Sequence, residues 1–153
     1  MRNPILVAVA GTLLLASPAL AGGCYTGRFS GRLVTSMRMT LGVDKFGALN
    51  GVMDVVVADR GRARARGFGG RTFVQYLHCS TYDGVVKCSA ECDSGIMTVL
   101  RMDDAVLEFG TRGLVVGNRT EACSTETLNL AGPDGEAVTF RLDRADKAMC
   151  NGL

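Results

Sequence analysis

Short apolar segments separated by turn-forming residues run through most of the chain, and this rhythm limits the fold more than any other feature. Met37, Met39, Leu41 and Val43 alternate with polar or small residues, which is the two-residue period of a strand with one buried face. Further runs typical of strands occupy residues 52–58, 72–77, 96–100, 105–109, 114–116 and 138–142. Glycine, asparagine and aspartate gather between these runs, as turns between short strands require.

This pattern predicts an all-β protein, a small disulfide-stapled antiparallel β-barrel or sandwich of about 8 to 10 short strands. The 20 glycines of the chain suit turns and bulges better than a helical bundle. A single helical turn is expected near the end, within residues 144–149. No linker or repeat divides residues 22–153, which we expect to form one domain.

The first 21 residues have the features of a cleaved signal peptide. Arg2 supplies the positive charge, residues 5–16 form an apolar or small-residue run, and residues 19–21 offer small side chains for cleavage after Ala21. The run is shorter than the about 20 residues that a transmembrane helix needs. We therefore expect a periplasmic or extracellular protein with no transmembrane segment after cleavage. A lipid anchor on Cys24 is an alternative, although two glycines separate it from the cleavage position.

Six cysteines follow the signal segment, and an even number in an exported chain predicts disulfides. They are Cys24, Cys79, Cys88, Cys92, Cys123 and Cys150. One pairing follows from a turn. Asp83-Gly84 is a preferred two-residue hairpin loop, which places Tyr82 opposite Val85 and Cys79 opposite Cys88. At that register the two cysteines form a non-hydrogen-bonded pair with Cα atoms about 4.5 Å apart, within disulfide reach.

The other four cysteines allow three pairings. We favour Cys24–Cys150 with Cys92–Cys123, because these bonds would tie the two ends of the chain together and staple its middle.

An arginine at every second residue marks the segment 60–66. In an extended chain Arg60, Arg62, Arg64 and Arg66 would project from one face, with small residues on the other. Arg71 follows after a glycine-rich turn. The charge is one-sided along the chain: residues 22–71 hold nine basic and three acidic side chains, and residues 72–153 hold seven basic and twelve acidic ones.

Two interpretations of this segment stay open. Arg60, Arg62, Arg64, Arg66 and Arg71 could bind an anionic ligand or an acidic protein surface, since guanidinium groups suit carboxylate and phosphate. Alternatively they form a solvated strand paired with acids on a neighbouring strand, such as Asp103, Asp104 or Glu108, and charged runs are more often solvated surface. Nucleic acid is the least expected partner, because no aromatic side chain interleaves with the arginines to stack bases.

Catalytic and metal chemistry is poorly supported. His78 is the single imidazole and abuts Cys79, which the hairpin assigns to a disulfide. Met37 and Met39 could be imagined as copper ligands with His78, but they continue into the apolar face of a strand and are expected in the core. We predict no metal and no cofactor.

The sequence therefore predicts a non-catalytic exported binding or inhibitor module of the cell envelope. The alternatives are a structural envelope protein with no soluble ligand and, with less support, a small hydrolase.

Overall fold

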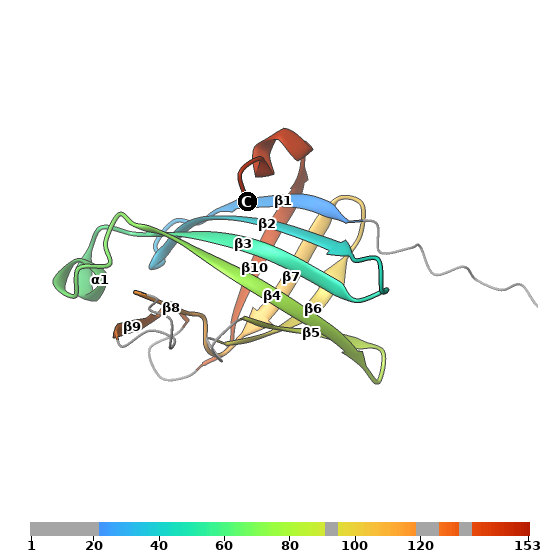
Figure 1. Cartoon of the computed structure of the whole chain (residues 1–153). Helices are drawn as coiled ribbons and strands as arrows, with labels where there is room; N and C mark the ends of the chain where they lie inside the picture. The colour runs from blue at the N-terminus through green and yellow to red at the C-terminus, as the bar shows by residue number, and fades with distance from the viewer. Residues whose placement is uncertain (1–21, 91–94, 119–125, 132–135) are drawn as a thin grey trace, which may run out of the picture.

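The computed structural model describes residues 22–90, 95–118, 126–131 and 136–153. Eight strands form a closed antiparallel barrel in the order β1-β10-β7-β6-β5-β4-β3-β2 (Figure 1). They are β1 (Gly23–Arg28), β2 (Val34–Val43), β3 (Leu49–Val57), β4 (Thr72–Tyr82), β5 (Val85–Ala90), β6 (Ile96–Met102), β7 (Val106–Thr111) and β10 (Val138–Ala145). A separate pair is formed by β8 (Val115–Asn118) and β9 (Glu126–Asn129), and short helical turns lie at α1 (Gly61–Ala65) and η2 (Lys147–Cys150). The predicted all-β fold is confirmed, and of the two architectures that the sequence left open, barrel and sandwich, the structure has the barrel.

The barrel interior is filled by the apolar faces of its strands. Met37 and Met39 of β2 are buried as their alternation predicts, whereas Val43 at the strand end is 50% exposed. Phe109 and Phe140 stack with ring centroids 5.4 Å apart. A barrel of about eight strands is only wide enough to be filled by its own side chains. The interior is therefore a hydrophobic core.

Two strands were not predicted. β1 has the sequence GCYTGR, in which no apolar alternation is visible. It forms because β2 and β10 both supply hydrogen-bonding partners, so that Cys24 lies opposite Thr40 on one side and Ala145 on the other. β9 similarly exists through its pairing with β8.

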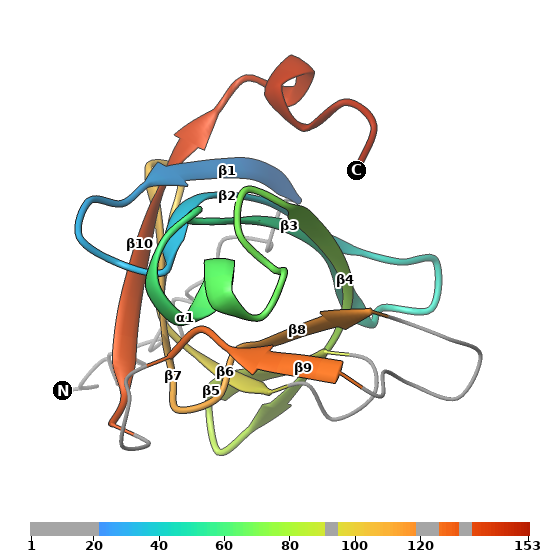
Figure 2. The same cartoon turned by 90° about the vertical axis from the view of Figure 1, so that its left-hand side faces the viewer.

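One end of the barrel is covered by residues 58–71, which include α1, and by the β8–β9 pair (Figure 2). We call these segments the cap. Ala63, Phe68 and Leu128 of the cap are buried in the same apolar cluster as the barrel interior. Gln75, an inward residue of β4, donates a hydrogen bond from Nε2 to the carbonyl of Val115. The cap is thus attached to the wall by apolar packing and by a buried amide.

The extended conformation on which the single arginine face at residues 60–66 depended is not formed, because this segment holds α1. Arg66 donates its backbone N–H to the carbonyl of Arg62 at 3.2 Å, as in a helical turn. The chain must reverse here, since Val57 and Thr72 end and begin neighbouring antiparallel strands. Gly61, with φ +51°, opens the reversal and Ala63 buries its methyl group in the cap. Alanine and arginine also both favour a helix.

The predicted hairpin disulfide Cys79–Cys88 is confirmed, with Cα atoms 3.9 Å apart. Its register is the one expected, because Tyr82 lies opposite Val85. Asp83 and Gly84 have φ values of +48° and +75°. Positive φ at both central residues is the requirement of the tight hairpin turn.

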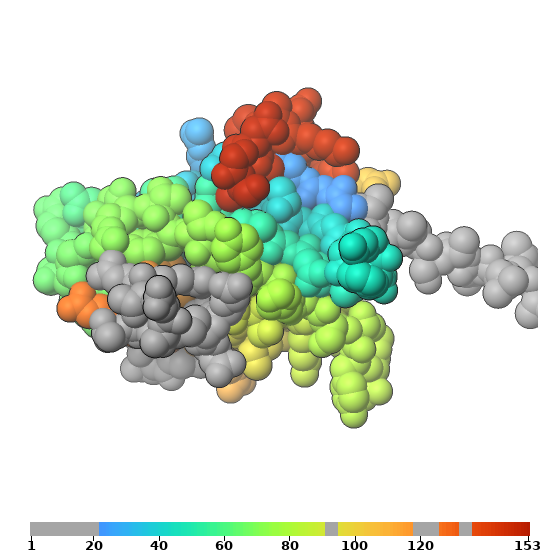
Figure 3. Space-filling view, in the orientation of Figure 1, coloured from blue at the N-terminus to red at the C-terminus, as the bar shows by residue number. Residues whose placement is uncertain are grey.

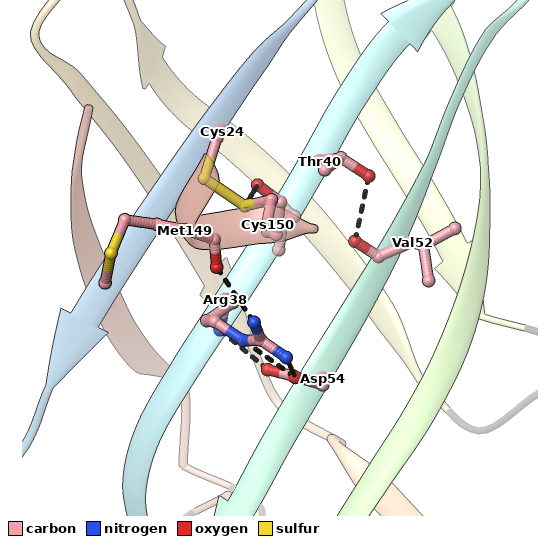
Figure 4. A network of polar contacts seen from close by, with 8 residues as sticks. Cys24, Arg38, Thr40, Val52, Asp54, Met149 and Cys150 are labelled. Carbon is pink, nitrogen blue, oxygen red and sulfur yellow. Dashed lines mark hydrogen bonds and ion pairs between the residues drawn. A yellow bond between two sulfur atoms is a disulfide. The ribbon is translucent and has the colours of Figure 1, made fainter. Parts of the chain in front are cut away.

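The second disulfide, Cys24–Cys150, is also confirmed, and joins residues 126 positions apart. It holds η2 against the outside of the barrel beside β1 and β2, where the C-terminal segment is visible in red (Figure 3). Arg38 of β2 reaches the same segment, donating from Nη1 to the carbonyl of Met149 at 2.8 Å (Figure 4). Because the sulfur of Cys24 is in this bond, Cys24 is not free to carry a lipid.

Two predictions fall outside the described residues, the signal peptide at 1–21 and the Cys92–Cys123 pairing. In the part of the chain that the structure describes, no helix has the length and apolar character needed to cross a membrane.

Candidate anion-binding pocket

The arginines of residues 60–71 do not share one face. Arg64 is paired with Asp59, with Nε 3.0 Å from Oδ1, and this hydrogen bond holds the pKa of the Asp59 carboxyl below its usual range. The guanidinium of Arg66 lies 5.7 Å from the ring centroid of Phe68, and that of Arg71 lies 4.9 Å from the ring of Phe73. A short helix turns successive side chains in different directions, so the single stripe is not formed.

The alternative interpretation named Asp103, Asp104 and Glu108 as partners of the arginines, and in the described structure segment 60–66 does not pair with these acids. Asp103 pairs with Arg101 at 2.7 Å, and Glu108 lies 3.8 Å from Arg141. Between described residues, no ion pair joins an arginine of segment 60–66 to the acids at 103–108. That specific form of the alternative is wrong.

Arg62 lines a pocket. The pocket has a volume of about 610 Å³, within the about 300–1,000 Å³ typical of small-molecule sites. It lies between α1, the turn that joins β1 to β2, and the start of β10. A second cation, Arg32, lines it from that turn. The remaining lining residues are Leu33, Leu130, Ala131, Ala137, Val138 and Thr139.

Backbone carbonyls orient both guanidinium groups. Arg32 donates from Nη1 to the carbonyl of Thr139 at 2.8 Å, and its guanidinium lies 5.3 Å from the ring centroid of Phe140. Arg62 donates from Nη2 to the carbonyl of Asn129 at 2.7 Å. Each group uses one nitrogen in these bonds, and guanidinium has five N–H donors. Donors therefore remain on both side chains for a ligand.

Neither pocket arginine is neutralised within the described part of the chain. The ion pairs there involve other arginines, and Arg32 and Arg62 are not among them. A carbonyl oxygen fixes the direction of a guanidinium without removing its charge. Leu130 and Ala131, 5% and 4% exposed, provide apolar wall beside these charges. An apolar pocket lined by two charged donors has the composition of a site for an anionic molecule.

Arg60 contributes to the pocket indirectly, through a hydrogen bond to the backbone of Arg32. Its Nη2 donates to the carbonyl of Arg32 at 2.6 Å. This bond ties α1 to the turn between β1 and β2, and so holds the two elements that carry Arg32 and Arg62. Arg60 is therefore a positioning residue for the pocket.

Arg32 was missed by the sequence analysis. It stands alone after Gly31, whose φ of +75° forms the turn, and it belongs to no repeat. The turn formers around it indicate a loop, but Arg62, which lines the same pocket, is 30 residues away in the chain. The local sequence contains no signal that these two residues share a pocket.

The catalytic candidate His78 is a residue of β4, and its side chain is exposed on the outer face of the barrel. Its Nδ1 is 3.2 Å from Oδ1 of Asn50, and the adjacent Cys79 is in a disulfide. This pair therefore has no free thiol to act as a nucleophile. Met37 and Met39 face the core, so they do not meet His78 as copper ligands would. Among the described residues, no group of three or more histidine, cysteine or acidic side chains is placed to hold a metal ion.

Comparison of the chain with protein-family models, with curated proteins and with solved structures finds no match in any of the three.

Proposed function

We propose that this chain is an exported, non-catalytic binding module of the cell envelope that holds a small anionic ligand in the Arg32–Arg62 pocket. The observation that carries the proposal is the pair of guanidinium groups that line one apolar pocket and are held by carbonyls rather than by carboxylates. A carboxylate or phosphate entering there would gain charge-assisted hydrogen bonds in a partly desolvated setting.

Export is supported by two features. Residues 1–21 have the order of a signal peptide. The described cysteines Cys24, Cys79, Cys88 and Cys150 are all in disulfides, which form and persist in oxidising compartments.

The filled barrel supports binding at the cap end rather than inside the barrel. Met37, Met53 and Phe140 are at most 1% exposed in the interior, so a ligand would have to displace the core. The pocket beside the cap needs no such displacement.

Binding of sodium butyrate and of inorganic phosphate, followed by NMR titration of backbone amides, tests the proposal. Replacing both pocket arginines, in the double variant Arg32→Gln/Arg62→Gln, should raise the dissociation constant at least about tenfold, since each charged hydrogen bond is worth about 1.5–3 kcal/mol. The matched control is Arg64→Gln/Arg66→Gln, which also removes two positive charges, both of them from the cap, but leaves the pocket lining intact. It should change the constant by less than about twofold, because exposed charges contribute little.

If both double variants lose affinity equally, the anion is attracted by the arginine-rich surface in general and the pocket is not its specific site. If neither probe perturbs the pocket amides even at low salt, the proposal fails, and the structural envelope protein without a soluble ligand becomes the better interpretation.

A further inference from the structure

A second hollow lies on the outer face of the barrel wall, over β6, β7 and β10, with a volume of about 560 Å³. The strand register explains it. Thr98 and Thr139 lie opposite Gly110 on its two sides, so these residues form one outward row across the strands. Gly110 contributes no side chain, and the gap between the two threonines is the floor of a groove.

The rim of this groove along β6 is apolar, and Arg112, which follows β7, also lines the hollow. Ile96 and Leu100, on either side of Thr98 along β6, are 62% and 59% exposed. An irregularity in the pairing between Val99 and Arg101 accompanies Leu100, and bulges of this kind re-aim side chains. Outward positions of a water-facing wall are usually polar. Ile96 and Leu100 are large, exposed aliphatic side chains, and together with the bare backbone of Gly110 they give this side of the groove an apolar surface.

The groove and the Arg32–Arg62 pocket meet at the start of β10. Ala137 and Thr139 line both. The carbonyl of Thr139 is also the acceptor that orients Arg32. A single ligand could therefore contact the two cations and continue over Ala137 and Thr139 onto Gly110. The step from Thr139 to Gly110 is short, because they are partners on neighbouring strands, which lie about 4.8 Å apart.

We propose that the ligand is an anionic amphiphile. Its carboxylate or phosphate head is bound by Arg32 and Arg62, and an unbranched apolar chain lies in the groove floored by Gly110. This inference rests on the proposed function and specifies the class of ligand for that pocket. The chemistry is shared by a free fatty acid and by an anionic lipid.

The width of the groove favours a hydrocarbon chain over a peptide. The floor corresponds to one missing side chain in the row Thr98–Gly110–Thr139, which suits a slender chain. An extended peptide binds most readily by adding to an open sheet edge. The barrel is closed, so a peptide on this face would find no backbone partners.

The first test is a chain-length series of butyrate, octanoate and dodecanoate, used below the concentration at which they form micelles. Affinity should rise about threefold for each methylene that enters the groove, somewhat below the about 0.8 kcal/mol of full burial. Arg32→Gln/Arg62→Gln should weaken all members of the series.

The second test fills the groove. A Cβ at Gly110 would meet Cδ1 of Leu100 at 3.7 Å, an ordinary contact, and the backbone there has no positive φ. Gly110→Val should therefore fold, lower the affinity for dodecanoate to nearly that for butyrate, and leave butyrate binding unchanged. The matched control, Ser80→Val, adds the same side chain to an exposed position on β4 that lines neither hollow, and should leave both affinities unchanged.

The outcomes separate the two proposals. If butyrate binds through Arg32 and Arg62 but affinity does not increase with chain length, the amphiphile is wrong and the anion pocket stands. If dodecanoate binds equally well to Arg32→Gln/Arg62→Gln, the assignment of the head group is overturned. Cosedimentation with phosphatidylglycerol vesicles that is lost in Gly110→Val would support a lipid as the source. Binding of free dodecanoate without vesicle binding would support a fatty acid.

Discussion

Different physical features determine the conformation of the barrel wall and that of the cap. In the wall, each strand has two neighbours, and the two-residue period decides which side chains are inward. In the cap, residues 58–71 and the β8–β9 pair pack on one end of the barrel, and their conformations depend on the residues they contact there. Arg62 and Arg64 lie two residues apart on α1, yet one lines the pocket and the other pairs with Asp59. The wall supplies a rigid frame, and the cap determines where the charges lie.

The largest expected effect on the free energy of unfolding concerns the place where β1 and β10 pair and close the barrel, which brings the first and last strands together. The cystine Cys24–Cys150 closes a loop of 126 residues and Cys79–Cys88 one of 9. In the chain-entropy model, removing the first as a double alanine variant costs about 5 kcal/mol and removing the second about 2.5 kcal/mol. Urea unfolding of the two variants measures the difference. Equal losses of unfolding free energy in the two variants would show that the pairing of β1 with β10 is maintained without the Cys24–Cys150 bond.

The second prediction compares the cores of the two regions. Phe140 in the wall and Phe68 in the cap are both 1% exposed. Phe140→Ala should lower the free energy of unfolding by about 4 kcal/mol, because it leaves a cavity in the shared core. Phe68→Ala should lower it less and speed hydrogen exchange of the cap amides selectively, if the cap can open locally. Uniformly faster exchange in Phe68→Ala would contradict the division into wall and cap.

The third prediction compares an ion pair in each region. Asp54 in the wall is paired with Arg38, and its side chain is 6% exposed (Figure 4). Asp59 in the cap is 58% exposed beside Arg64. Asp54→Ala should cost about 2 kcal/mol, since it strands a charged partner. Asp59→Ala should leave the melting temperature nearly unchanged. Similar losses in the two variants would mean that burial does not distinguish the pairs.

The smallest expected effect is the pH dependence of a turn in the wall. The backbone N–H of Ala105, the guanidinium of Arg101 and the N–H of Val106 all bond the Asp103 carboxylate, and they lower its pKa. A lowered pKa in the folded state stabilises the protein above the unfolded value of about 3.9, and this contribution is lost as the pH falls through the folded value. The urea midpoint of wild type should therefore exceed that of Asp103→Asn at pH 7, and the gap should narrow in acid. A gap independent of pH would rule out the carboxylate as its cause.

Much of the wall could be predicted from the sequence, and the reasons are local. The period of two in Met37, Met39 and Leu41 identifies an inward face, and Asp83-Gly84 specifies a turn whose register pairs Cys79 with Cys88. Each of these inferences uses neighbours in the chain.

The cap and the pocket could not be predicted in the same way. The alternation of residues 60–66 is compatible with a strand, but the reversal of the chain between β3 and β4 and the burial of Ala63 against the end of the barrel favour a helical turn. Arg32, Arg62 and Thr139 line one pocket only because β1 and β10 pair and close the barrel. A similar dependence hides the groove, because Gly110 becomes its floor only when Thr98 and Thr139 flank it.

The position of a bound anion would test the pocket at atomic level. We suggest a crystal structure of the protein with 4-bromobenzoate, whose bromine can be located by anomalous scattering independently of the protein phases. The expected result is a carboxylate within hydrogen-bond distance of both Arg32 and Arg62, with the bromine over the apolar wall formed by Leu130, Ala131 and Val138. A bromine peak on the solvent side of α1 beside Arg64 and Arg66, with the pocket empty, would contradict the assignment of this site.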